Sequence, residues 1–212
     1  MSANSLLTKV FLITLTGFFL ISCASSYKVP KPSDLNFITQ TSNDGLILQY
    51  RYDILESKYA KKELRKGIKI IAVKITNNSG KDYIFGKDLT LEYSSGREVH
   101  FMDRALTYKS IKQGSAIYSL YLLMTPLNLY TYSTNSYGLQ EETSSTPIGL
   151  VLGPGLALVN ILKSSSANRK FKEQLQDYDL IGKQIVVGET VYGIIPIKTA
   201  SFDALHLKLL KN

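Results

Sequence analysis

Apolar and polar positions alternate in two parts of the chain, and this period-two pattern predicts β-strands with one buried face. Leu46, Leu48 and Tyr50 begin the pattern, and turn-forming clusters such as Asn77-Asn78-Ser79-Gly80 separate the stretches that follow. The expected strands cover 46–53, 70–76, 83–85, 89–93, 99–101, 184–187, 191–197 and 205–209. About seven short strands with turns between them predict an immunoglobulin-like β-sandwich, so the expected fold class is mainly β.

The middle of the chain, from about Ala105 to Leu180, departs from this pattern and predicts a helical insertion. Two stretches, 116–124 and 148–162, are apolar on nearly every side of a helix. The second contains Gly153-Pro154-Gly155, which predicts a break in the helix. Residues 138–145 are polar and glycine-led, and they predict a loop.

The insertion ends in an amphipathic segment at 167–178. Phe171 and Leu175 lie four residues apart and share one helical face. Arg169 precedes Glu173 by four residues on another face, a spacing that favours an ion pair. The sequence therefore predicts a helix with one buried side.

The N-terminus has the layout of a secretory signal peptide. Lys9 is the only charged residue in 1–22, and residues 10–21 form an apolar core. A membrane-spanning helix needs about 20 apolar residues, so this core is too short to span well. The sequence therefore predicts that residues 1–22 are a signal peptide.

The junction after this core, Leu20-Ile21-Ser22-Cys23, resembles the lipobox of bacterial lipoproteins, and Cys23 is the only cysteine in the chain. The resemblance covers the signal and its junction. It implies that the Cys23 sulfur receives a diacylglycerol, that a peptidase cuts before Cys23, and that the new amino group is acylated. Two or three fatty chains hold a protein on a membrane almost permanently.

The residues after Cys23 bear on the location of the protein. Gram-negative lipoproteins that stay in the inner membrane commonly carry aspartate after the cysteine, whereas this chain has Ala24. No acidic residue lies in 24–28, so the resemblance implies the outer membrane with the domain facing the periplasm. The two prolines in 29–34 predict an extended tether, and we expect 23–40 to be the lipidated cysteine and its tether.

The remaining residues, 41–212, are expected to form the sandwich with a helical insertion at about 105–180. In 68–91 and 185–209 the chain resembles the immunoglobulin-like domains of bacterial envelope lipoproteins. The features that carry this resemblance are IAVKITNNSGKDYIF, VVGETVYGIIPI and DALHLKLL. Members of that family are mostly interaction modules, and the resemblance supplies no catalytic residues.

The charge of the chain and its short motifs limit which partners and catalytic sites we expect. The chain has a net charge of +8, but its lysines are scattered, which predicts a solvated surface and no nucleic-acid partner. An anionic lipid surface is the alternative that the excess charge favours. His100 and His206 each stand alone, and Glu141-Glu142 lie in the expected loop. We therefore expect no catalytic residue, no metal site and no cofactor.

Five tyrosines in the insertion are the candidate binding residues. Tyrosine offers an apolar face and a polar tip, which suits a glycan or a peptide ring. Packing at the edge of the core is the favoured alternative for them. The candidates are Tyr118, Tyr121, Tyr130, Tyr132 and Tyr137.

The apolar segment 148–162 has three interpretations: it packs on the sandwich, binds an envelope protein partner, or contacts the membrane. Packing on the sandwich is favoured, and it would cover Leu150, Val151, Leu156 and Leu158. The function expected from the whole sequence is a membrane-anchored envelope lipoprotein that acts as a non-enzymatic interaction or structural module. An envelope enzyme or a glycan- or peptide-binding protein is the alternative.

Overall fold

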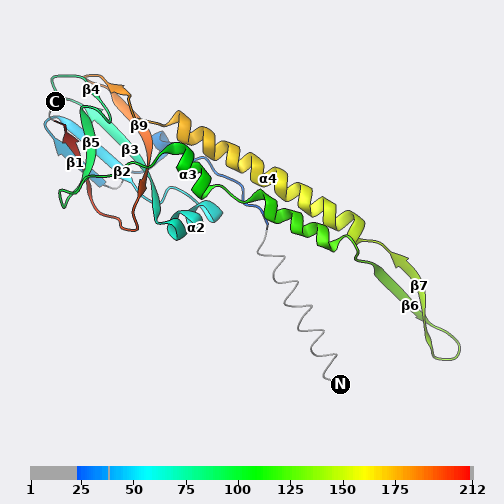
Figure 1. The fold of residues 1–212 in the computed structure, drawn as a ribbon. Helices are drawn as coiled ribbons and strands as arrows, with labels where there is room; N and C mark the ends of the chain where they lie inside the picture. Colours follow the sequence, from blue (N-terminus) through cyan, green and yellow to red (C-terminus); the bar gives the residue numbers. More distant parts are fainter. Residues whose placement is uncertain (1–22, 38, 211–212) are drawn as a thin grey trace. The chain divides into compact units, whose positions relative to one another are not determined.

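The computed structural model describes residues 23–37 and 39–210, and Figure 1 shows their secondary structure. The predicted signal peptide, 1–22, lies outside the described residues. The chain divides into two compact units. The β-rich unit comprises Tyr27–Lys112 and the residues from Asn168 onward, and the insert unit comprises residues 23–26 with Gln113–Ala167.

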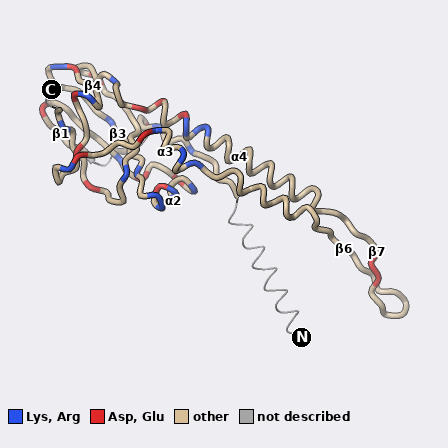
Figure 2. Tube along the Cα trace, viewed as in Figure 1, with Lys and Arg blue, Asp and Glu red and all other residues tan. Residues whose placement is uncertain are grey.

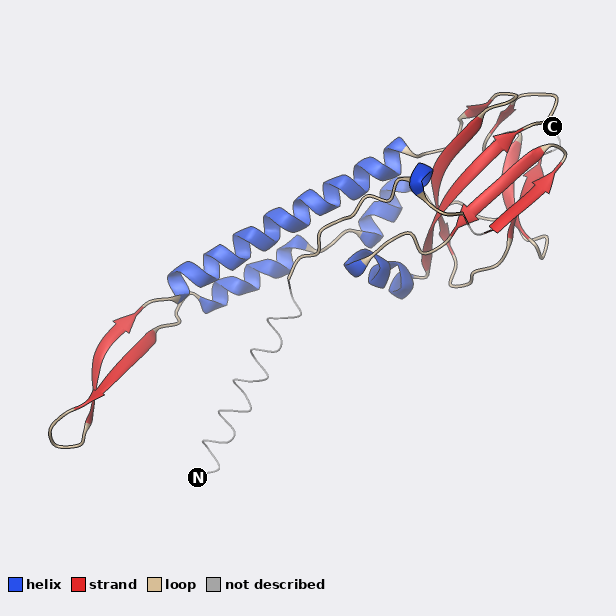
Figure 3. Ribbon diagram, turned by 180° about the vertical axis from the view of Figure 1, so that it is seen from behind, coloured by secondary structure: helices blue, strands red, loops and turns tan. Residues whose placement is uncertain are grey.

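The main sheet of the β-rich unit has four antiparallel strands in the order β1-β2-β3-β9 (Figure 3). Leu46, Leu48 and Tyr50 are buried and the residues between them are partly exposed, which confirms the predicted alternation. The strands of this sheet are β1 (Thr39–Asn43), β2 (Leu46–Arg51), β3 (Ile68–Asn77) and β9 (Thr190–Lys198).

Strand β1 was not predicted: its first two residues were assigned to the tether, 23–40, and the first expected strand began at Leu46. Asp44 and Gly45 join β1 to β2 with φ angles of 48° and 78°. An Asp-Gly pair with two positive φ angles forms the tight turn that suits a two-residue hairpin. The β-structure therefore begins before residue 41.

Two further two-stranded antiparallel sheets belong to this unit, β10-β5 and β4-β8. One hydrophobic core contains residues from all of these strands except β1. Leu180 also belongs to this core, and it packs so closely on Gly193 of β9 that a Cβ there would overlap its side chain. The four strands are β4 (Tyr83–Ile84), β5 (Leu89–Tyr93), β8 (Gln184–Ile185) and β10 (Leu205–Leu209).

Three short helices complete the unit: η1 (Pro32–Asp34), α2 (Ser57–Lys66) and α3 (Arg104–Ile111). The segment expected as a solvated tether is packed. Tyr27 is buried, its ring contacts Tyr59 and Phe171 at centroid distances of 4.7 and 5.3 Å, and its hydroxyl donates to Gln174. These three contacts hold Tyr27 in place, so the chain at Tyr27 is not a free linker.

The insert unit holds a helical pair and a β-hairpin. The 3₁₀-helix η2 runs beside the first part of α4, and the hairpin connects the two (Figures 1 and 3). Its elements are η2 (Ser115–Met124), β6 (Leu129–Thr134), β7 (Gln140–Thr146) and the part of α4 (Gly149–Asp177) that ends at Ala167.

Three sequence predictions were wrong at this level. The stretch 138–145 is not a loop, because β7 covers most of it and pairs with β6 after a turn at Gly138. Residues 99–101 form no strand and make only an isolated bridge at Phe101. Helix α4 continues through Pro154, so Gly153-Pro154-Gly155 does not break it.

Other predictions were confirmed. Phe171 and Leu175 are buried on one side of α4, and Arg169 lies 3.8 Å from Glu173. The described chain is thus a mixture of antiparallel sheets and helices, in which one helix, α4, is long and apolar.

Candidate membrane-contact surface

Small residues on one face of α4 let η2 approach it closely. Gly149, Gly153 and Ala157 recur every four residues, so they lie above one another on the helix. A Cβ at Gly149 would overlap the carbonyl oxygen of Met124, and one at Gly153 would lie 2.8 Å from the Thr125 hydroxyl oxygen. Spacing of small residues at every fourth position is typical of helix pairs in membranes, where backbones pack without bulky side chains between them.

Polar side chains are buried further along the same face. Asn160 and Ser164 are 5% and 0% exposed. The Ser164 hydroxyl donates to the Ser115 hydroxyl at 2.9 Å, and the Asn160 amide donates to the carbonyl of Leu156 at 2.9 Å. The interior of the insert unit therefore contains polar groups that are hydrogen-bonded, as buried polar groups require.

The outside of the same pair is apolar. At about 100° per residue, the exposed apolar residues of α4 fall on every side except the one that faces η2. We name this set the apolar helical surface. It consists of Ile117, Leu120, Leu122 and Leu123 of η2, and Leu150, Val151, Leu152, Leu156, Leu158, Val159 and Leu162 of α4, all exposed.

Charges are nearly absent here. The span Gln113–Ala167 contains three charged residues, Glu141, Glu142 and Lys163, and the two glutamates lie in the hairpin. In Figure 2 the trace of the first part of α4 and of the helix beside it is tan, the colour of uncharged residues, whereas blue and red segments are spread through the β-rich unit. A monomer in water rarely leaves a large apolar patch uncovered. This surface therefore needs an apolar partner.

The favoured expectation for this segment was wrong. Leu150, Val151, Leu156 and Leu158 were expected to be covered by the sandwich, but all four are exposed. Full burial of such a side chain is worth about 1.5–3 kcal/mol, so the apolar helical surface as a whole represents on the order of 10 kcal/mol of unrealised burial.

Cys23 adjoins this surface within the insert unit. Cys23 itself is exposed, and the next residue, Ala24, is 3% exposed because it packs into the small core with Tyr118, Tyr121 and Ala157. The Ala24 backbone N–H donates to Asn160 Oδ1 at 2.6 Å. The position of Cys23 along α4 is thereby fixed close to Asn160.

A second pair of hydrogen bonds holds the next residue. The Ser25 N–H donates to Gln113 Oε1 at 3.0 Å, and Gln113 Nε2 donates back to the Ser25 carbonyl at 2.7 Å. Gln113 is 3% exposed, so this exchange is shielded from water. Sequence analysis missed Gln113 and Asn160 because neither belongs to a recognisable motif.

The five candidate tyrosines do not form one site. Tyr118 and Tyr121 are buried in the core of the insert unit, while Tyr130 and Tyr132 are exposed on the same face of β6 and Tyr137 is exposed in the hairpin turn. Tyr118 and Tyr121 therefore have a packing role. The exposed three lie on the hairpin, which suits contact with an interface between lipid and water, where tyrosine is enriched.

Helix α4 has the dimensions of a membrane segment. It is 29 residues long, and among the described residues it is the one helix that is long and apolar enough to cross a membrane. Only 28% of its most apolar window is buried. The break expected at Gly153-Pro154-Gly155 does not exist, so the apolar part of α4 is continuous.

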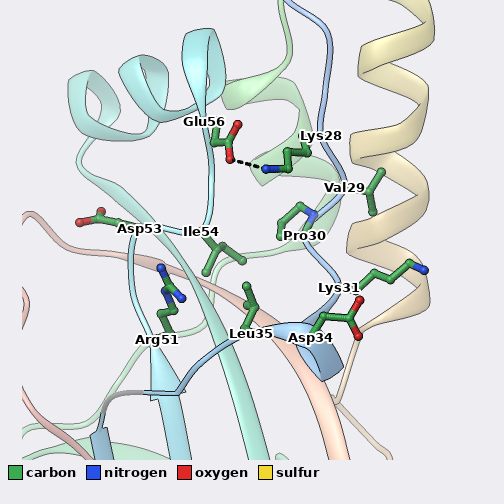
Figure 4. A pocket seen from close by; sticks show the side chains of 10 residues that line it. All are labelled: Lys28, Val29, Pro30, Lys31, Asp34, Leu35, Arg51, Asp53, Ile54 and Glu56. Atoms are coloured by element: carbon green, nitrogen blue, oxygen red, sulfur yellow. Dashed lines mark hydrogen bonds and ion pairs between the residues drawn. The ribbon is translucent and has the colours of Figure 1, made fainter.

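The β-rich unit contains a shallow hollow of about 380 Å³ (Figure 4). Lys28 points to Glu56 across it at 3.3 Å, but both side chains are largely exposed, so water screens the pair. Its basic and acidic side chains balance, and it contains neither histidine nor tyrosine. The charged lining residues are Lys28, Lys31, Arg51, Asp34, Asp53 and Glu56.

One carboxyl group is buried away from this hollow. Glu63 is 2% exposed, and its Oε1 accepts from the Ile70 N–H at 2.6 Å. Burial raises the pKa of Glu63 to about 7, against the opposing effects of that hydrogen bond and of Lys69. No group of three or more His, Cys, Asp or Glu residues in 23–37 and 39–210 could hold a metal ion.

No protein-family model matches the chain, and no curated protein or solved structure matches it.

Proposed function

We propose that this chain is a bacterial envelope lipoprotein that is cleaved before Cys23, is held on a membrane by lipid on that cysteine, and acts as a non-enzymatic interaction or structural module. The observation that carries the proposal is the junction itself. The lone cysteine is exposed, and the two residues after it are fixed by hydrogen bonds to a unit whose outer surface is apolar.

The proposed location is the outer membrane, with the β-rich unit on the periplasmic side. Ala24 supports this because it occupies the position where an aspartate would favour retention in the inner membrane. Its burial adds a structural reason for a small residue there, since the pocket formed by Tyr118, Tyr121 and Ala157 leaves little room.

The β-rich unit is, on this proposal, an immunoglobulin-like sandwich. Its support is a shared hydrophobic core to which strands of the four-stranded sheet and of both two-stranded sheets contribute. A module of this kind presents surfaces and loops to partners and needs no catalytic group. The mixed and screened charges of the hollow at Lys28 and Glu56 fit that role.

Metabolic labelling with a fatty acid tests the anchor. The wild-type precursor should incorporate the label and lose residues 1–22, whereas Cys23→Ala should do neither. The matched control is the double variant Cys23→Ala, Ser26→Cys, which keeps one thiol three residues away and should stay unlabelled. Label in Cys23→Ala, or cleavage of the wild type at another bond, would refute the proposal.

A further inference from the structure

We infer that the η2–α4 pair crosses the hydrocarbon layer of the same bilayer that holds the lipid on Cys23, with the apolar helical surface in contact with lipid tails. This inference rests on the proposed lipidation of Cys23 and adds the partner of the apolar surface. It follows from the position of the anchor, the composition around the helices, and the properties of the hairpin.

The anchor marks one boundary of the layer. Asn160 fixes Ala24, and Ser164 and Ser115 meet by a hydrogen bond close by, so polar groups gather at the Cys23 end of the pair. Lys163 is the first charged residue of α4, and it lies between Asn160 and Ser164 in the sequence. Acyl chains on Cys23 must enter the membrane. The part of α4 that precedes Lys163, residues 149–162, contains no charged residue.

The composition around the helices identifies lipid as the occupant. A helix that lies flat on a membrane keeps a polar face toward water. Here the exposed residues of α4 from Leu150 to Leu162 are leucine and valine apart from Pro154 and Gly155, and the polar residues Asn160 and Ser164 are buried. A helix that is apolar on every uncovered side is suited to immersion.

The hairpin indicates that the pair crosses the layer completely. β6 and β7 form an isolated two-stranded sheet with unpaired outer edges, and β7 carries Glu141 and Glu142. Unpaired strand edges are not tolerated in hydrocarbon, so the hairpin lies beyond it. The exposed Tyr130 and Tyr132 are then placed where aromatic side chains collect at the membrane boundary.

The lengths agree with a thin membrane. From Gly149 to Lys163 an α-helix rises about 21 Å, and the 3₁₀-helix η2 has a similar length of about 20 Å. Outer-membrane proteins present an apolar band of about 25 Å. A difference of this size is within what tilting and local thinning of a bilayer accommodate.

Photolabelling from within the bilayer tests the inference on the full lipidated protein. Wild-type protein in outer-membrane vesicles is irradiated with a lipid carrying a diazirine in its acyl chain, and labelled peptides are identified by mass spectrometry. We expect label in 115–124 and 149–162 and at least tenfold less in 57–66, the α2 segment.

Two matched variants sharpen the test. Val151 in α4 and Leu64 in α2 are 75% and 73% exposed. Val151→Asp should reduce the label in 149–162 severalfold, whereas Leu64→Asp should leave the pattern unchanged. Circular dichroism of both variants checks that each remains folded, which is expected because neither aspartate would be buried inside the protein.

The outcomes separate this inference from the proposed function. Lipid on Cys23 with label confined to the peptide that contains it would overturn the inference and leave the lipoprotein proposal standing. Absence of lipid on Cys23 would remove the proposal on which the inference rests. A second copy that covered the apolar helical surface would leave both helices unlabelled and yield a dimer on sedimentation in detergent, and that result would also overturn the inference.

Discussion

The two units use the same kinds of residue in opposite ways. In the β-rich unit, leucine, isoleucine and valine fill one core, and lysine, arginine and acidic residues cover the outside. In the insert unit, Asn160, Ser164 and Gln113 are buried, while leucine and valine of η2 and α4 are exposed. In both units the buried polar side chains of the described residues are hydrogen-bonded. The two units therefore differ in their outer surfaces, which are charged in one and apolar in the other.

The different placement of apolar residues indicates that the hydrophobic effect has a different role in each unit. In the β-rich unit it drives the chain to fold, because burial there removes apolar surface from water. Between helices that face lipid, as we infer for η2 and α4, the hydrophobic effect is absent, and close packing and hydrogen bonds hold the elements together instead. Substitutions of the same type should therefore have different effects in the two units.

The largest contrast is expected for leucine truncation. Leu91 is fully buried in β5, so Leu91→Ala should lower the free energy of unfolding by about 3 kcal/mol and the Tm by roughly 6–12 °C. Leu139, exposed beside the hairpin turn, is the control, and Leu139→Ala should change the Tm by less than about 1 °C. Thermal melting by circular dichroism compares them. Similar losses for both variants would contradict the contrast between the units.

Glycine substitutions within one helix should give effects of opposite sign. Gly149→Ala should separate η2 from α4, because the new Cβ overlaps the Met124 carbonyl, and should cost roughly 1–3 kcal/mol. Gly155 has no neighbour within 4 Å, so Gly155→Ala should stabilise α4 by about 0.5–1 kcal/mol. Hydrogen exchange of the amides in 115–124 reports the difference. Equal exchange in both variants would show that the close approach at Gly149 is unimportant.

A smaller effect is expected from the buried carboxyl of the β-rich unit. The pKa of Glu63 is raised to about 7 in the folded chain, from an ordinary value of 4.5, so folding favours its protonated form. Its destabilising effect therefore grows as the pH rises from about 4.5 to 7. Glu63→Gln, which can still accept from Ile70, should be more stable than wild type by on the order of 2 kcal/mol at pH 8.

At pH 4 the two proteins should have nearly equal stability, because Glu63 is then protonated in both the folded and the unfolded chain. Chemical denaturation at pH 4, 6 and 8 measures the trend. A constant difference across that range would show that the pKa of Glu63 is not raised in the folded protein.

The smallest effect is expected at the exposed ion pair of α4. Arg169 and Glu173 are both largely solvent-exposed, and such pairs contribute little. Arg169→Ala should therefore shift the Tm by less than about 1 °C, as measured by calorimetry. A larger loss would mean that Arg169 packs against other groups through its aliphatic stem.

The alternation of Leu46, Leu48 and Tyr50 predicted β2 correctly, because a strand with one buried face leaves its period in the sequence. The Asp44-Gly45 turn carried a comparable signal for β1, which was overlooked because the prolines of 29–34 suggested a tether. The turn residues Asp44 and Gly45 thus indicated a strand before β2.

The insert unit was harder to predict for a physical reason. A helix with apolar residues on most sides has the same sequence pattern whether protein or lipid covers it, so Leu150 and Val151 could not be assigned to a core or a surface. The small residues at Gly149, Gly153 and Ala157 were the available signal for a close helix pair. Asn160 and Gln113 bind the backbone of Ala24 and Ser25, and no short sequence motif predicts these distant contacts.

The docking of Ala24 and Ser25 also sets an order of events. The proposed cleavage bond lies between Ser22 and Cys23, one residue before a buried alanine that is held by Asn160. A peptidase must draw several residues on each side of the bond into its own cleft, and a docked chain cannot supply them. Cleavage therefore has to precede docking, and a precursor that matured too slowly would complete its insert unit around an uncut signal. The hydrogen bonds of Ser25 with Gln113 would then hinder cleavage of a docked precursor, and in the mature chain they would support the fold.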